Sequence, residues 1–107
     1  MFFWKKKEET KVELKEGAIR RLYRFYGRVQ GVGFRFNAHN LALEYGCTGW
    51  VRNEDDESVT MEIQGLAEDI DKVIQGLQKD RYIQIDTYDC SLLKVNPKET
   101  SFQSKYY

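Results

Sequence analysis

Two segments with helical periodicity lie between segments that alternate like β-strands, and this order constrains the fold more than any other feature. In each helical segment, apolar residues recur at three- and four-residue spacing, which gives a helix one apolar face. The predicted helices cover residues 34–45 and 67–79. The predicted strands cover residues 19–29, 47–53, 59–65 and 82–93, and a last strand-like stretch covers 100–106.

This β-α-β-β-α-β order predicts an α+β fold, the ferredoxin-like βαββαβ sandwich. In that arrangement two helices pack on one face of a four- to five-stranded antiparallel sheet, with right-handed crossovers. A chain of 107 residues is long enough for one such domain, which we expect over residues 19–107. Residues 1–18 are rich in charge and can bury little apart from the apolar cluster at residues 2–4, so we expect an N-terminal extension there.

Charge and composition argue against several classes of function. The 17 Lys and Arg residues balance 17 Asp and Glu residues, so nothing attracts the chain as a whole to nucleic acid or an anionic membrane. Apolar runs are far shorter than the ~20 residues of a membrane helix, and we see no signal peptide. We therefore expect a cytoplasmic monomer with no membrane or nucleic-acid partner.

The cysteines and the histidine do not suggest a metal site. Cys47 and Cys90 form no CxxC pair and have no zinc-type spacing to a histidine. We expect two buried, reduced cysteines, although the sequence also allows a disulfide. His39 lies in a helical pattern without a cluster of ligand residues. No metal or other cofactor is therefore expected.

The sequence from Gly27 to Arg35 joins the first strand to the first helix and contains three glycines. Glycine lets backbone N–H groups approach a ligand closely, and a helix start offers unpaired N–H donors at the positive end of its dipole. Arg35 adds a full charge and a bidentate fork. The turn therefore suits an anion such as phosphate. A tight turn with a solvated Arg35 is the alternative.

Other nucleotide-binding motifs do not fit this turn. A dinucleotide fingerprint would need glycine or alanine in place of Phe36, and a P-loop would need Gly-Lys followed by Ser or Thr. The run Gly33-Phe34-Arg35-Phe36 is superficially similar to an aromatic RNA-binding strand. These residues open a helix, however, and Phe34 belongs to its apolar face.

Two sequence blocks in register resemble the signature of the acylphosphatase family. The first block is Gly27–Arg35 and the second is Gly46–Asn53, with Ala42 between them at the family's spacing. A looser similarity extends over residues 20–107. The resemblance implies the ferredoxin-like fold and metal-free hydrolysis of small-molecule acyl phosphates, which yields a carboxylate and inorganic phosphate.

The resemblance also implies the roles of individual residues. Arg35 matches the arginine that binds phosphate, and Asn53 matches the asparagine that holds the attacking water. The backbone amides of residues 30–35 match the phosphate cradle, which comprises Gln30, Gly31, Val32, Gly33, Phe34 and Arg35.

The chemistry of acyl phosphates suits such a residue set. The leaving carboxylate has a pKa near ~4 and departs without protonation, so no general acid is needed. Phosphoryl transfer depends mainly on positioning and charge stabilisation. An asparagine amide can hold a water through its acceptor and donor groups but is too weak a base to deprotonate it, so we expect the substrate's own oxygens to take the proton.

The sequence departs from the family pattern at three places. Asp56-Glu57 stands where many members have Asp-Gly, Ser104 and Lys105 replace an aliphatic residue and an arginine, and residues 80–82 replace Gly-Pro. We expect these changes to affect stability and pocket shape. Trp50 and Tyr23 are expected to pack in the core.

Two functions are alternatives to acyl phosphate hydrolysis. A non-catalytic phosphate-binding or interaction domain is one alternative. A domain of a carbamoyl-transfer protein is disfavoured because the 107 residues contain no further domain.

Overall fold

The computed structural model describes residues 11–106, so the apolar cluster at residues 2–4 lies outside the described part. The elements are β1 (Ile19–Arg28), α1 (Phe34–Tyr45), β2 (Thr48–Asn53), β3 (Val59–Gly65), α2 (Ala67–Lys79), β4 (Gln84–Leu93) and β5 (Phe102–Lys105). The predicted β-α-β-β-α-β order is confirmed, both helices have the predicted bounds, and the C-terminal stretch forms β5.

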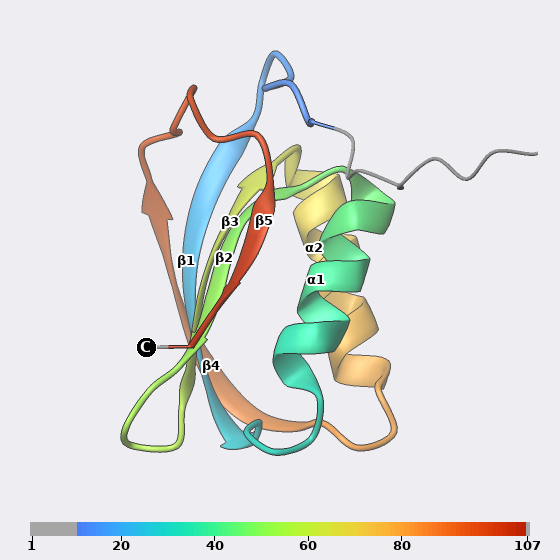
Figure 1. Ribbon diagram of the computed structural model, residues 1–107, viewed down its shortest axis with the longest axis vertical. Coiled ribbons are helices and arrows are strands. Elements are labelled where there is room, and N and C mark those ends of the chain that lie inside the picture. Colours follow the sequence, from blue (N-terminus) through green and yellow to red (C-terminus); the bar gives the residue numbers. More distant parts are fainter. Residues whose placement is uncertain (1–10, 107) are drawn as a thin grey trace, which may run out of the picture.

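Both helices cover one face of a five-stranded sheet with the strand order β4-β1-β3-β2-β5 (Figure 1). The pairings of β1 with β3 and β4, and of β2 with β3, are antiparallel. The prediction of an entirely antiparallel sheet was wrong at one edge, because β5 pairs with β2 in parallel. The connection after β4 crosses to the far edge at the end of the sheet where β4 finishes, so β5 runs back in the direction of β2.

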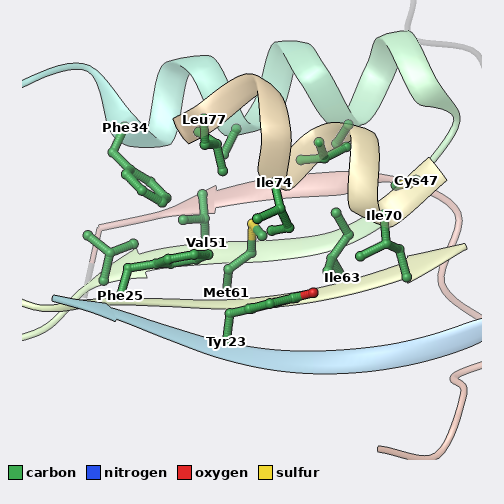
Figure 2. Close-up of a cluster of buried hydrophobic side chains, with 14 of the residues drawn as sticks. Tyr23, Phe25, Phe34, Cys47, Val51, Met61, Ile63, Ile70, Ile74 and Leu77 are labelled. Atoms are coloured by element: carbon green, nitrogen blue, oxygen red, sulfur yellow. The ribbon is translucent and has the colours of Figure 1, made fainter. Parts of the chain in front are cut away.

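The core lies between the sheet and the two helices, and Figure 2 shows the inward side chains meeting there. Helix α2 contributes Ile70, Val73, Ile74 and Leu77, and α1 contributes Phe34, Ala38 and Ala42. From the sheet come Tyr23, Phe25, Val51, Met61 and Ile63, all at most 3% exposed. Burial of these side chains is the main source of stability.

Tyr23 packs in the core as predicted, whereas the prediction for Trp50 was wrong. Strand alternation turns Val51 toward the helices and Trp50 toward the open face of the sheet. There the half-buried indole lies under two cations, with Lys105 Nζ 4.4 Å and Arg52 Cζ 5.1 Å from the ring centroid. The tryptophan therefore links β2 to the edge strand β5.

The two cysteines are free and differ in exposure. Cys47 is buried, whereas Cys90 is exposed on the edge strand β4, so the prediction that both are buried was wrong for Cys90. Nearly all of β4 is exposed because it lies at the edge of the sheet. Within residues 11–106, no helix is both long enough and apolar enough to cross a membrane.

Residues 11–18 form no helix or strand, but they contact the domain. The Val12 amide donates to the Thr100 carbonyl at 3.0 Å, and Lys15 Nζ lies 3.9 Å from a carboxylate oxygen of Asp69. The boundary between extension and domain at residue 18 stays a prediction.

Strand direction brings three segments to one end of the molecule. Since β1 and β2 are both antiparallel to β3, and β5 is parallel to β2, the C-terminal ends of β1, β2 and β5 all lie at the same end of the sheet. The β1–α1 loop, the β2–β3 hairpin and the segment after β5 all lie toward this end, in the lower part of Figure 1. Arg35, Asn53 and Tyr106 belong to these three segments.

Candidate active site

The loop between β1 and α1 takes its shape from two glycines in left-handed conformations. Gly31 has φ 72° and Gly33 has φ 81°, values that other residues adopt only at an energetic cost. A lack of space does not explain why residue 31 is glycine, since a Cβ added to Gly31 would meet no atom of the described residues within 4 Å. The backbone conformation itself therefore requires glycine.

Helix α1 begins at this loop with backbone amides that form no intrahelical bond. Asn37 donates the first bond of the helix, to the Gly33 carbonyl at 3.0 Å. Within the described chain no side chain caps the N-terminus of α1, and its first turn contains no acidic residue. The amides of Phe34, Arg35 and Phe36 therefore offer donors at the positive end of the helix dipole.

The Arg35 guanidinium is held by the segment that follows β5. Its Nη1 donates to the Lys105 carbonyl at 3.0 Å, and its Cζ lies 4.4 Å from the centroid of the Tyr106 ring. An arginine has five N–H donors in one plane. The Lys105 carbonyl and the Tyr106 ring orient the group, which has further N–H donors to offer an anion.

Gln30 connects the glycine loop to the β2–β3 hairpin. Its Nε2 donates to the Glu54 carbonyl at 2.8 Å and to the Ser58 carbonyl at 2.9 Å. Both amide hydrogens are therefore used within the protein. Val32 packs against the core instead of facing a ligand. Any contribution of Gln30 and Val32 to the cradle must come from their backbone amides.

A cavity of about 510 Å³ opens beside the start of α1. It is lined by Val29, Gly31, Gly33, Phe34, Arg35, Phe36, His39, Asn53, Phe102, Gln103, Ser104 and Tyr106. The structure thus brings together Arg35, Asn53 and three of the predicted cradle residues. Gln30 and Val32, also predicted there, do not line the cavity.

Sequence reasoning missed two aromatic residues at this cavity, Phe36 and Tyr106. Phe36 directly follows Arg35, so its position at the helix start could have been inferred from the same pattern. Tyr106 gave no such signal, because it reaches Arg35 only through the parallel pairing of β5 with β2.

The cavity has a positive electrostatic character. Among the described residues, Arg35 is the one lysine or arginine in its lining, and no aspartate or glutamate lines it. Glu54, next to Asn53, has its carboxylate engaged elsewhere: the Thr60 hydroxyl and the Arg52 guanidinium lower its pKa. Residues 11–106 contain no group of three or more His, Cys, Asp and Glu side chains placed to hold a metal.

Comparison with known proteins identifies the family. The model of the acylphosphatase family matches residues 21–104, which is most of the chain. The chain belongs to the acylphosphatase family. This membership makes it an acylphosphatase, an enzyme that hydrolyses acyl phosphates, and agrees with the glycine loop, arginine and asparagine around the cavity.

Individual acylphosphatases are similar to this chain over nearly their whole length. The acylphosphatase of Oceanobacillus iheyensis is 37% identical over 82 residues, which cover 75% of this chain and 90% of that protein. That of Clostridium acetobutylicum is 35% identical over 88 residues, which cover 81% and 97%. The crystal structure of the Bacillus subtilis acylphosphatase superposes with a TM-score of 0.76 at 22% identity over 82% of this chain and 99% of that one, so it confirms the fold.

Proposed function

We propose that Arg35 and the amides of residues 30–35 hold the phosphoryl group of a small-molecule acyl phosphate, while Asn53 holds the attacking water. One observation carries this proposal. Arg35, the glycine loop and Asn53 line one cavity, and its lining within residues 11–106 has a single lysine or arginine and no aspartate or glutamate.

The phosphoryl group of the substrate carries negative charge, and the proposed site complements it. The N–H donors at the start of α1 and the N–H donors of the Arg35 guanidinium can bind the same anion. In phosphoryl transfer, an arginine that stabilises the transition state contributes about 10³–10⁵ in rate. Lys105 and Tyr106 hold the guanidinium in place before substrate binds, so little reorganisation is required.

Asn53 ends β2 and lies on the cavity wall. Its carbonyl oxygen accepts a hydrogen bond from the water, whose lone pair then attacks phosphorus in line with the leaving group. The P–O bond to the acyl oxygen breaks, and the carboxylate leaves with the electron pair. The proton of the water passes to a phosphoryl oxygen, so an acyl phosphate dianion and water yield a carboxylate and dihydrogen phosphate.

The proposal also includes the domain, the oligomeric state and the cellular location in which the enzyme acts. We expect residues 19–107 to act as one catalytic domain, as a monomer in the cytoplasm and without a nucleic-acid partner. The zero net charge of the chain supports the last point, because no general electrostatic attraction draws it to phosphate backbones.

Hydrolysis of benzoyl phosphate in ¹⁸O-labelled water tests the reaction and the bond that breaks. We expect turnover by the purified protein with the label in inorganic phosphate, because water attacks phosphorus. Label in benzoate would instead show attack at the carbonyl carbon and would overturn the role of the phosphate cradle. Thermal stabilisation by phosphate without any hydrolysis would indicate a non-catalytic anion-binding domain.

A further inference from the structure

The cavity is larger than the phosphoryl group requires. Pockets for drug-sized ligands measure about 300–1,000 Å³, and this one measures about 510 Å³. If the glycine loop and Arg35 hold the phosphoryl group, the remaining space lies where the acyl group must extend. The residues that border this space then decide which acyl groups fit.

Two exposed aromatic side chains flank Arg35 at this cavity. Phe36 is 69% exposed and Tyr106 is 79% exposed, and both are lining residues. Phe36 follows Arg35 in the first turn of α1, and the Tyr106 ring lies against the Arg35 guanidinium. An acyl group is joined to the phosphoryl group through a single oxygen, so it stays within the cavity that these rings line.

The charges around the cavity also restrict the acyl group. Within the part of the chain that the structure describes, the lining has no second lysine or arginine to pair with an extra carboxylate or phosphate on the acyl group. The described lining residues also include no aspartate or glutamate to pair with an amine. A charged acyl group would therefore lose hydration without gaining a partner, whereas a flat apolar group would cover two exposed rings.

We propose that Phe36 and Tyr106 form an acyl-group subsite that favours acyl phosphates with a flat, uncharged, apolar acyl group. This inference rests on the proposed function, because Arg35 must hold the phosphoryl group for the acyl group to reach the two rings. Phe36 and Tyr106 are thus specificity-determining residues.

The test compares kcat/KM for benzoyl phosphate and acetyl phosphate in the wild type and in Phe36→Ala and Tyr106→Ala. The ratio of the two values cancels any effect that a substitution has on Arg35, since both substrates share the phosphoryl group. Loss of a side chain from an apolar subsite reduces discrimination by about tenfold or more. We expect the benzoyl-to-acetyl ratio to fall about tenfold in each variant, mainly through KM for benzoyl phosphate.

Tyr82→Ala is the matched control. Tyr82 is 66% exposed, like Phe36 and Tyr106, but does not line the cavity. We expect it to leave the ratio unchanged. An unchanged ratio in Phe36→Ala and Tyr106→Ala, with wild-type hydrolysis intact, would overturn the subsite alone. Absence of hydrolysis of both substrates by the wild type would instead overturn the proposed function.

Discussion

Gln30 holds the hairpin that follows Asn53: its side-chain amide donates to the Glu54 carbonyl at 2.8 Å. A second bond from the same nitrogen reaches the Ser58 carbonyl at 2.9 Å, so the glycine loop and both ends of the hairpin form one unit. Because Glu54 directly follows Asn53, the position of the proposed water site relative to Arg35 depends on Gln30.

Replacing Gln30 should therefore impair catalysis more than substrate binding. We expect Gln30→Ala to lower kcat about tenfold with a small change in KM, and Gln30→Glu to be worse because a carboxylate repels the two carbonyls. Gln84→Ala is the control, since Gln84 is exposed and bonds to nearby Asp86. Equal kcat values for Gln30→Ala and the wild type would exclude this positioning role.

Arg20 should matter for stability more than any exposed arginine. It is 5% exposed and bonds Glu62 at 2.8 Å and Glu99 at 2.8 and 3.1 Å, which fixes the connection between β4 and β5. Arg20→Met leaves two carboxylates without their partner and should lower the free energy of unfolding by about 3–5 kcal/mol. Urea denaturation measures this loss.

The exposed pair between Arg24 and Asp56 provides the comparison for Arg20. Arg24→Ala should cost about 0–1 kcal/mol, because water screens the pair. Similar losses in the two variants would show that the buried network has no special importance.

Stability should fall at alkaline pH because of two buried groups. Burial raises the pKa of the Cys47 thiol to about 12 and that of the Tyr23 phenol to about 12, against ordinary values of about 8.5 and 10. The unfolded chain therefore loses these protons first. The stabilisation is complete below about pH 8 and is lost as pH rises toward 12, with a slope of up to about 1.4 kcal/mol per pH unit for each group.

Urea denaturation between pH 8 and 11 measures this slope. Cys47→Ala and Tyr23→Phe should each make it shallower, while Tyr82→Phe, which changes an exposed tyrosine, should leave it unchanged. If Cys47→Ala or Tyr23→Phe gave the same slope as Tyr82→Phe, ionisation of that buried group would not be the cause.

The β2–β3 hairpin contains a strained residue that can be relieved. Glu57 has φ 73°, in the left-handed region that favours glycine. A left-handed backbone conformation costs a residue with a side chain about 1–2 kcal/mol. Glycine avoids this cost, but its greater freedom in the unfolded chain offsets part of the gain. We expect Glu57→Gly to raise the free energy of unfolding by about 0.5–1 kcal/mol.

Asp55→Gly, in the same turn, is the control for Glu57→Gly. Among the described residues other than glycine, Glu57 alone has a positive φ, so glycine at position 55 relieves no strain and should destabilise the fold. Stabilisation by both changes would show that the effect comes from lost charge and not from backbone conformation.

Much of the fold followed from the sequence because apolar residues recur at helical spacing in both helices. The stripe from Ile70 to Leu77 and the stripe from Phe34 to Ala42 are buried as predicted. The parallel pairing of β5 did not follow, since a four-residue strand carries little pattern and its neighbour is chosen by the path of the preceding connection. Trp50 was misplaced because apolarity does not reveal which face of a strand is covered.

The candidate site, too, could be predicted from the sequence only in part. The glycine loop and Arg35 are contiguous in sequence, so their local chemistry could be inferred from their spacing. Asn53 gained its meaning only from the family resemblance. The contacts of Arg35 with Lys105 and Tyr106 join residues about seventy positions apart, and no local pattern encodes them.

The central claim assigns different tasks to Arg35 and Asn53, and the binding of inorganic phosphate measured beside kcat tests it most directly. Arg35→Ala should weaken phosphate binding at least about tenfold and lower kcat/KM by about 10³–10⁵. Asn53→Ala should leave the Kd for phosphate within about twofold and lower kcat about a hundredfold, because it removes only the position of the water. Arg81→Ala and Asn40→Ala, which change exposed residues outside the cavity, should match the wild type in both measurements. Full activity of Arg35→Ala, or equal loss of phosphate binding in Asn53→Ala and Arg35→Ala, would contradict the account.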